Sequence, residues 1–449
     1  MKKMKSIFGI LVALVLLNTN VFAQDKPSPN YTLITNVNVW DGISDKLEKA
    51  DVLVEGNLIK QISKEPLFIA QIDGNTIIDG GGRTLMPGLI DAHWHTLLSS
   101  ITLEEGQSEE ADYLHARAIV GAENTLMRGF TTVRDVGGPV FGIKKAIDEG
   151  LLEGPRIFPS GALISQTSGH GDFSHVYDGP RAFGAAPPRF EQLGISRVAD
   201  GVDEVLAATR YNLKQGATQI KVMAGGGVSS LYDQLYVNEY TAEELKAIVD
   251  AASDWGTYVT VHIYNEKGIA RALNAGVKGI EHGHLMSEES AKLMAEKGAW
   301  LCIQPFYKDI PGAETLDPGR YAKFMQVVDG FDKTMKLVKK YNLNMAFGTD
   351  LLFSPKTNGQ QGDLLARFKN LYSDVEILRM ATSNNAKYFE LSGPGHPYKE
   401  GPLGVIKQGA YADILLVDGD PLKDVSILGE DGKNIPLVMK DGKIYKNTL

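Results

Sequence analysis

Residues 87–96 read PGLIDAHWHT, an apolar run that ends in two histidines one residue apart. Leu89, Ile90 and Ala92 are apolar, as expected of a buried strand, and His93 and His95 come at its end. Because strand residues two apart point to the same side, both imidazoles can bind one ion. The stretch therefore predicts a buried strand with a metal site at its carboxyl end.

Seven further short apolar runs follow, separated by helical patterns. The eight runs are LIDAHWH (89–95), FTTVRDVG (130–137), RIFPSG (156–161), IKVMAGGG (220–227), YVTVHIY (258–264), GIEHG (279–283), WLCIQPF (300–306) and NMAFGTD (344–350). Strands that alternate with helices predict a parallel sheet, and eight such units predict a closed barrel. Between two of the runs, Thr241 and Glu244 make a capping box that predicts a helix start. The expected fold class is α/β, a (β/α)8 TIM barrel.

Short β-type segments lie on both sides of the barrel. They are YTLITNVNVWDG (31–42), DVLVEGNLIKQI (51–62) and NTIIDGG (75–81) before it, and YADILLVDGDP (411–421) and LVMKDGKIY (437–445) after it. Neither end has enough strands to cover a face alone, so we expect both to form one small composite β-sandwich. The expected division is sandwich at 24–86, barrel at 87–402 and sandwich again at 403–449.

The first 23 residues have the pattern of a removable secretory signal. Lys2, Lys3 and Lys5 precede an apolar run at 7–17, and small residues up to Ala23 suit a cleavage site. A membrane anchor is the alternative, but the run is shorter than the roughly 20 residues that a bilayer requires. We therefore expect an exported bacterial protein, periplasmic or secreted, with no membrane attachment after cleavage.

The charge and the single cysteine narrow the classes of function. Loss of the three lysines of the leader would move the formal charge of the 449-residue chain from −9 to −12. An acidic protein of this kind is a poor partner for nucleic acid or anionic membranes, which bind Lys- and Arg-rich surfaces. Cys302, the only cysteine, allows no intrachain disulfide and is expected to be a small buried hydrophobe.

Six polar side chains fall in the expected strands. They are His93, His95, Lys221, His262, His282 and Asp350. All but Lys221 come at carboxyl ends, which is the face that carries chemistry in this architecture. One such histidine would be unremarkable, but six suitable side chains on five strand segments predict a site.

Lys221 lies between Ile220 and Val222, where an unpaired ammonium would carry a heavy desolvation cost. An ion pair with Asp350 or Glu281 is one explanation. The other is a neutral amine, since buried lysines readily lose their proton. A neutral amine can take up carbon dioxide to become a carbamate, whose two oxygens could bridge two cations.

Several of these motifs together resemble one known family. PGLIDAHWH, IKVMAGGG around Lys221, VHIYN, GIEHGH and FGTD, with the closing GAYADILLVDGDP, look like the amidohydrolase superfamily. The similarity is to its binuclear, imidazolonepropionase-related and prolidase-like branch, and it covers almost the whole mature chain. The resemblance implies that His93, His95 and Asp350 bind one metal and that His262 and His282 bind a second. Lys221, carboxylated, would bridge the two ions, which are usually zinc in this family.

This arrangement predicts hydrolysis of an amide or ester. Two cations lower the pKa of a bridging water, and Asp350 is placed to pass its proton to the leaving amine. SQTSGHGD resembles a TGGHGD segment of dipeptidase-like members, which makes His170 a candidate for polarising the scissile carbonyl, although Ser168 replaces a glycine. Tyr264 is a candidate hydrogen-bond donor to a substrate carboxylate. His284 is either a supporting residue or a third metal-binding imidazole.

Three functions compete. The first is a metallohydrolase of a peptide-like amide: a dipeptide ending in Pro or another hydrophobic residue, or a similar amide conjugate such as an N-acyl amino acid. The second is a deaminase or cyclic-amide hydrolase, which typically has one metal and is therefore disfavoured by Lys221. The third is an inactive scaffold protein, disfavoured by the six candidate ligands. We also expect a homo-oligomer, as in relatives. Arg134 and Asp135 are expected to brace either the barrel or the layer of metal ligands, and Gly225, Gly226 and Gly227 to form a flexible turn.

Overall fold

The computed structural model describes residues 30–230, 232–310, 313 and 316–449. The predicted signal peptide, residues 1–23, lies outside the described residues, so its removal and the export of the protein stay predictions. Within the described ranges, no helix combines the length and the apolar character needed to cross a bilayer.

Each of the eight apolar runs forms a strand. These strands are β6 (Leu89–Trp94), β7 (Phe130–Asp135), β8 (Arg156–Pro159), β11 (Ile220–Met223), β12 (Val259–Asn265), β13 (Gly279–Leu285), β14 (Trp300–Ile303) and β15 (Asn344–Phe347). All of their pairings are parallel, in the orders β6-β7-β8 and β11-β12-β13-β14-β15. The short strands β9 (Leu163–Ser165) and β10 (Ser196–Val198) extend the second group at β11.

Two backbone hydrogen bonds join the two groups of strands. Asp350 N–H, just after β15, donates to His93 O of β6 at 2.8 Å, and Thr218 N–H, just before β11, donates to Pro159 O of β8 at 2.8 Å. These bonds connect β15 to β6 and β8 to β11, which are the two places where the ladder of paired strands is interrupted. The eight strands are thereby linked in sequence order. This arrangement is consistent with the predicted (β/α)8 barrel.

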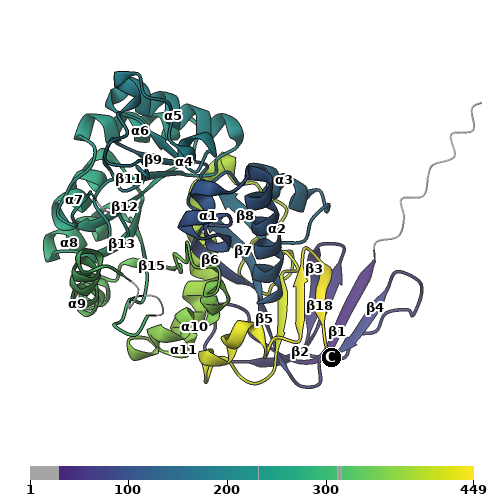
Figure 1. Cartoon of the computed structure of the whole chain (residues 1–449). Coiled ribbons are helices and arrows are strands. Elements are labelled where there is room, and N and C mark those ends of the chain that lie inside the picture. The colour runs from purple at the N-terminus through teal and green to yellow at the C-terminus, as the bar shows by residue number, and fades with distance from the viewer. Residues whose placement is uncertain (1–29, 231, 311–312, 314–315) are drawn as a thin grey trace, which may run out of the picture.

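Helices surround these strands (Figure 1). They are α1 (Leu103–Ser108), α2 (Ala111–Met127), α3 (Phe141–Asp148), α4 (Arg189–Gln192), α5 (Gly201–Gln215), α6 (Ala242–Asp254), α7 (Glu266–Ala275), α8 (Glu288–Lys297), α9 (Pro318–Tyr341), α10 (Gln361–Ala366), α11 (Asp374–Arg379) and α12 (Asn385–Phe389). Helix α6 begins at the predicted capping box of Thr241 and Glu244 and buries Leu245, Ile248 and Ala252. The largest core cluster lies between such helix faces and the strands.

Segments from both ends of the chain share one mixed sheet, beside the barrel strands (Figure 1). Its strands are β1 (Tyr31–Val39), β2 (Glu48–Glu55), β3 (Leu58–Ser63), β4 (Thr76–Asp79), β5 (Thr84–Pro87), β16 (Ile414–Val417), β17 (Leu437–Lys440) and β18 (Lys443–Asn447). The two ends meet where β16 pairs antiparallel with β5. The strands thus form one eight-stranded hydrogen-bonded sheet, and both a two-layered sandwich and the expected domain boundaries stay predictions.

Candidate metal centre and active site

His93, His95 and Asp350 meet at the carboxyl end of β6. The Nε2 atoms of His93 and His95 lie 3.2 Å and 3.4 Å from Oδ1 of Asp350. Both imidazoles point to the same side because they are two residues apart in the strand. Asp350 comes three residues after β15 with φ +55°, a left-handed conformation that Asp tolerates better than most residues. The sequence-predicted first set of ligands is therefore assembled, and its metal-binding role stays a prediction.

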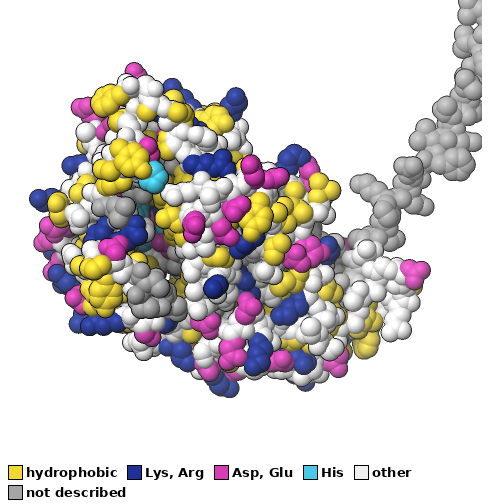
Figure 2. All heavy atoms as spheres, in the orientation of Figure 1, with side chains coloured by type: hydrophobic (Ala, Val, Ile, Leu, Met, Phe, Trp, Pro, Cys, Tyr) yellow, Lys and Arg dark blue, Asp and Glu magenta, His cyan; other side chains and the backbone are white. Residues whose placement is uncertain are grey.

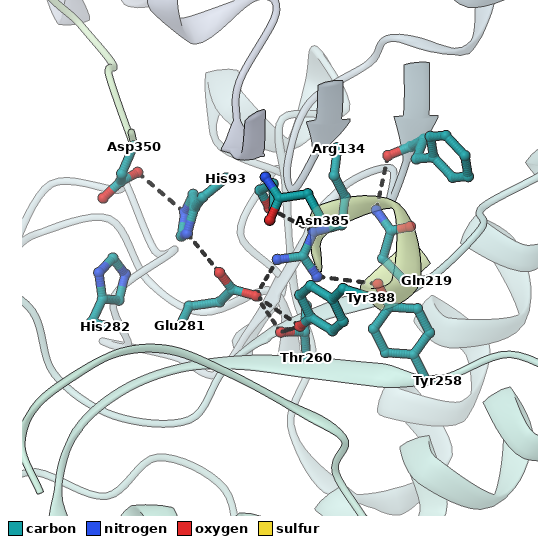
Figure 3. A network of polar contacts seen from close by, with 12 residues as sticks. His93, Arg134, Gln219, Tyr258, Thr260, Glu281, His282, Asp350, Asn385 and Tyr388 are labelled. Atoms are coloured by element: carbon teal, nitrogen blue, oxygen red, sulfur yellow. Dashed lines mark hydrogen bonds and ion pairs between the residues drawn. The ribbon is translucent and has the colours of Figure 1, made fainter. Parts of the chain in front are cut away.

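A second pair of imidazoles comes from the two adjacent strands β12 and β13. The ring centres of His262 and His282 are 4.4 Å apart. The ring centre of His282 lies 5.1 Å from that of His93, and these two residues are labelled in Figure 3. The Nδ1–H of His282 donates to the side-chain oxygen of Gln304 at 2.6 Å, which fixes the tautomer and leaves Nε2 free as a ligand. Burial lowers the pKa of both His262 and His282 well below the ordinary value, which favours the neutral form that binds metals.

Lys221 is the second residue of β11 and is buried, with 1% of its surface exposed. Among the described residues its amine has no hydrogen-bond partner, and no carboxylate oxygen lies within the 4.0 Å of an ion pair. The alternative of an ion pair with Asp350 or Glu281 is therefore wrong for this structure. Burial lowers the pKa of Lys221 even though Glu281 and Asp350 act in the opposite direction.

Beneath the histidines lies a buried polar network centred on Glu281 (Figure 3). Its Oε2 atom is 2.7 Å from Nδ1 of His93, and its Oε1 atom accepts hydrogen bonds from Arg134, at 2.5 Å, and from Thr260. The Arg134 guanidinium also donates to Ala92 O and lies 4.3 Å from the ring centre of Tyr388. Burial acts to raise the pKa of Glu281, but Arg134 and His93 outweigh it and hold this pKa well below its usual range.

Glu281 and His282 are adjacent in the chain, yet both contact His93. The reason is that His282 has φ +74°, which breaks the alternation of side chains along β13. Glu281 was expected from the sequence only as a possible partner of Lys221, and its contact with His93 was not predicted. A signal was present, since a carboxylate inside an apolar strand requires a buried partner, and VRD in another expected strand offered Arg134.

The predicted bracing residues lie close to the ligands. Asp135 accepts backbone hydrogen bonds from Thr96 at 2.7 Å and from Gly137 at 3.2 Å, just past His95. The carbonyl of Gly137 in turn accepts from Nδ1–H of His95 at 3.0 Å, which directs Nε2 to Asp350. Asp135 therefore fixes the turn on which His95 depends.

The predicted substrate-contacting residues adjoin the histidine cluster. The His170 ring stacks on His262 with ring centres 4.0 Å apart, and Tyr264 lies 5.3 Å from His262 and 5.0 Å from His282. Burial raises the pKa of Tyr264, so its hydroxyl stays a donor. Histidine side chains are visible within a hollow of the molecular surface (Figure 2).

His284 is separate from the other imidazoles. It is buried beside Phe306, and its Nε2–H donates to the carbonyl of Gln304 at 3.0 Å. Its ring centre is 6.4 Å from that of His282. The interpretation of His284 as a supporting residue fits this contact, because the same Gln304 holds His282 through its side chain.

The donor set suits a divalent transition metal. Ligand atoms of His93, His282 and Asp350 all lie within 4.8 Å of one another, and imidazole nitrogen with carboxylate oxygen is a set that zinc accepts. His93, His95 and His282 each have Nδ1 held by a neighbouring group, as is usual for histidines that bind a metal through Nε2. The residues present therefore fit a metal centre.

Comparisons with known proteins agree with this site. The sequence model of the amidohydrolase family matches residues 84–445. Ochratoxinase of Aspergillus niger is 32% identical over 416 residues, which cover 90% of this chain and 84% of the relative. The crystal structure of a prolidase complexed with N-methylphosphonate-L-proline is 35% identical, with a TM-score of 0.84, 93% of this chain and all of that chain covered.

A third relative has the same architecture. The structure of a Xaa-Pro dipeptidase with methionine bound in its active site is 31% identical, with a TM-score of 0.77, 93% of this chain and all of that chain covered. Strands, ligand set and relatives thus agree. The chain belongs to the amidohydrolase family, in its prolidase-like branch, and is a hydrolase of carbon–nitrogen bonds.

Proposed function

We propose that this protein is an exported binuclear metallohydrolase that cleaves a peptide-like amide. The substrate would be a dipeptide with Pro or another hydrophobic residue at its C-terminus, or an N-acyl amino acid of similar shape. One observation carries the proposal: Lys221 is fully buried near His93, His262 and His282, and its amine forms no ion pair within 4.0 Å among the described residues. A positively charged ammonium in this buried position would carry a high desolvation cost. Conversion of the Lys221 amine to an anionic carbamate that binds two cations would explain why a lysine is found here.

The proposed ligands divide into two sets. His93, His95 and Asp350 would hold one divalent ion, and His262 and His282 the other, both zinc by preference. The amine of Lys221 would add to carbon dioxide and release a proton, and the resulting carbamate would supply one oxygen to each ion. When bound, the two ions activate a water molecule and polarise the substrate carbonyl.

The protein's own groups would move the proton and hold the substrate. Asp350 would accept the proton of the attacking water and deliver it to the leaving amine, because its Oδ1 lies at the meeting point of His93 and His95. His170 would contact the scissile carbonyl and Tyr264 the substrate carboxylate, since both adjoin His262. The proline-derived phosphonate bound by the similar prolidase supports a substrate with a free carboxylate.

A second candidate function stays open on the same scaffold. A 5-methylthioadenosine/S-adenosylhomocysteine deaminase is 22% identical to this chain, and deamination or cyclic-amide hydrolysis of a heterocycle is the alternative. A bridging carbamate would argue against it, because these reactions typically use one metal. An inactive scaffold is opposed by the buried, preoriented ligand set.

The test is a library of dipeptides and N-acyl amino acids assayed with zinc and bicarbonate. Release of free amino acid supports the proposal. Ammonia from heterocycles with no amino acid released favours the alternative, and a folded protein that binds no metal and turns over nothing favours the scaffold. Sequencing of the exported product should begin at Gln24, and its mass in solution should exceed that of one chain, as expected of a homo-oligomer.

A further inference from the structure

We propose that Asp233 and Lys323 form a clamp that positions His170 over the metal centre, a role that depends on the function proposed above for His170. Neither residue is one of the predicted ligands or substrate contacts. Asp233 lies in the segment 224–241 between β11 and α6, and Lys323 lies on α9. His170 follows β9, so three separate parts of the chain meet here.

His170 is held on one side only. Its Nδ1 atom lies 3.1 Å from Oδ2 of Asp233 and 2.9 Å from Oγ of Ser230, and its backbone N–H donates to Glu239 at 2.9 Å. Its Nε2 atom has no hydrogen-bond partner in the described part of the chain, while the ring stacks on His262. Contacts at Nδ1 and at the backbone therefore fix the ring and leave Nε2 available to a substrate.

Asp233 is itself locked in place. Its side chain is 1% exposed, and Oδ2 also accepts the backbone N–H of Gly227 at 2.7 Å. A Cβ on Gly227 would lie 2.0 Å from Cε1 of His170, so only glycine lets the loop approach the ring this closely. The expected flexible turn at Gly225, Gly226 and Gly227 is thus a buried, closely packed segment.

Lys323 fixes this loop from outside the site. Its ammonium donates to the carbonyls of Gly227, Ser230 and Asp233 at 2.6, 2.8 and 3.0 Å. An ammonium has three donors, and all three are used on the loop. Lys323 therefore donates no hydrogen bond to His170 or to the proposed metal ligands, and it acts through the loop that carries Asp233.

Kinetics of single and double variants test the clamp in the zinc-loaded full chain. Asp233→Ala and Lys323→Met should each lower kcat about 10- to 100-fold, as the loss of a supporting hydrogen bond does, with KM and zinc content close to wild type. Neither change should lower kcat further in a His170→Ala background, because both act through His170. Asp329→Ala and Lys333→Met, at exposed positions of α9, are the matched controls and should leave kcat unchanged.

The result that overturns the clamp is a double variant whose losses multiply, or a fall in zinc content that explains the loss of kcat. Crystal structures of the zinc-loaded variants give a readout that does not depend on activity. In these structures the His170 ring should leave its stacked position on His262. A ring that stays in place refutes the clamp even if no substrate is found. Failure of the wild type to cleave any amide refutes the proposed function instead. Asp233→Asn, which keeps the side-chain shape, carries the test if Asp233→Ala does not fold.

Discussion

Nδ1 of His93 lies 2.7 Å from Oε2 of Glu281, so a proposed metal ligand contacts a buried carboxylate directly. The other oxygen of that carboxylate accepts from Arg134, which is also fully buried. Glu281 thus has two structural roles. It directs Nε2 of His93 to Asp350, and it supplies the negative charge that Arg134 requires.

Replacement of Glu281 by Gln should destabilise the metal-free protein by about 3–5 kcal/mol, because Arg134 is left as an uncompensated buried charge. Urea unfolding measures this loss. The double variant Arg134→Met with Glu281→Gln should recover much of it, since no charge then stays buried. Asp250→Asn, in an exposed ion pair with Lys246, is the control and should change stability by less than about 1 kcal/mol. If the loss of unfolding free energy in the double variant equals the sum of the losses in the two single variants, the ion pair of Arg134 and Glu281 is not the cause of the destabilisation.

The same Glu281→Gln variant should bind zinc about 10- to 100-fold more weakly, because His93 loses the partner that orients it. A competition titration with a chelator measures the affinity. An unchanged zinc affinity would remove Glu281 from the support of the metal centre.

Asp350→Asn should retain most of its metal yet lower kcat by several decades, since the amide keeps one oxygen for coordination but cannot accept a proton. Metal analysis and steady-state kinetics on one preparation separate the two effects. Turnover near that of the wild type would exclude Asp350 as the proton carrier.

His284 should make the metal-free protein sensitive to acid. Burial lowers its pKa from 6.5 to about 3, so the unfolded chain takes up a proton near pH 6.5 and the folded protein does not until about pH 3. The unfolded state binds more protons in this window, and stability falls as the pH falls through it.

His284→Phe removes this contribution while keeping an aromatic ring beside Phe306. Between about pH 7 and pH 4.5 the variant should lose about 2–3 kcal/mol less unfolding free energy than the wild type. Urea unfolding at the two pH values gives the difference, and the other buried histidines cancel because both proteins contain them. Equal losses in both proteins would contradict the prediction.

The strands were predictable from sequence because a barrel strand buried on both faces gives a short continuous apolar run. PGLIDAHWHT and the seven later runs all form strands, and the capping box at Thr241 begins a helix. The pairing of β5 with β16 could be expected only in outline. Its register depends on contacts between residues more than 300 positions apart, for which a single sequence holds no signal.

The histidine and aspartate ligands were predictable because each comes near the end of an apolar run, and Lys221 because it is a charged residue inside one. Glu281 was missed as a support of His93 because strand alternation places neighbours on opposite faces, and the φ of His282 breaks that rule. Asp233 and Lys323 were missed for another reason. Asp233 contacts His170 through its carboxylate, and Lys323 contacts the carbonyls of a loop. Both contacts join residues far apart in the sequence, and such contacts leave no periodic pattern in it.

Lys221→Ala should lose at least one of the two metals and most of the activity, because the bridging oxygens disappear with the side chain. A short carboxylic acid such as acetate fits the space that is left and supplies two oxygens, so it should restore part of kcat. Lys214→Ala, near the end of α5 at an exposed position, is the control. No response to any short carboxylate, with both metals retained, would contradict a bridging role.

The most direct measurement is a crystal structure of the protein grown with zinc and bicarbonate. The account predicts density for a carboxyl group on Nζ of Lys221, with one oxygen on each of two zinc ions that His93, His95, Asp350, His262 and His282 complete. A bare amine at Lys221 beside one zinc ion, or beside none, would contradict it.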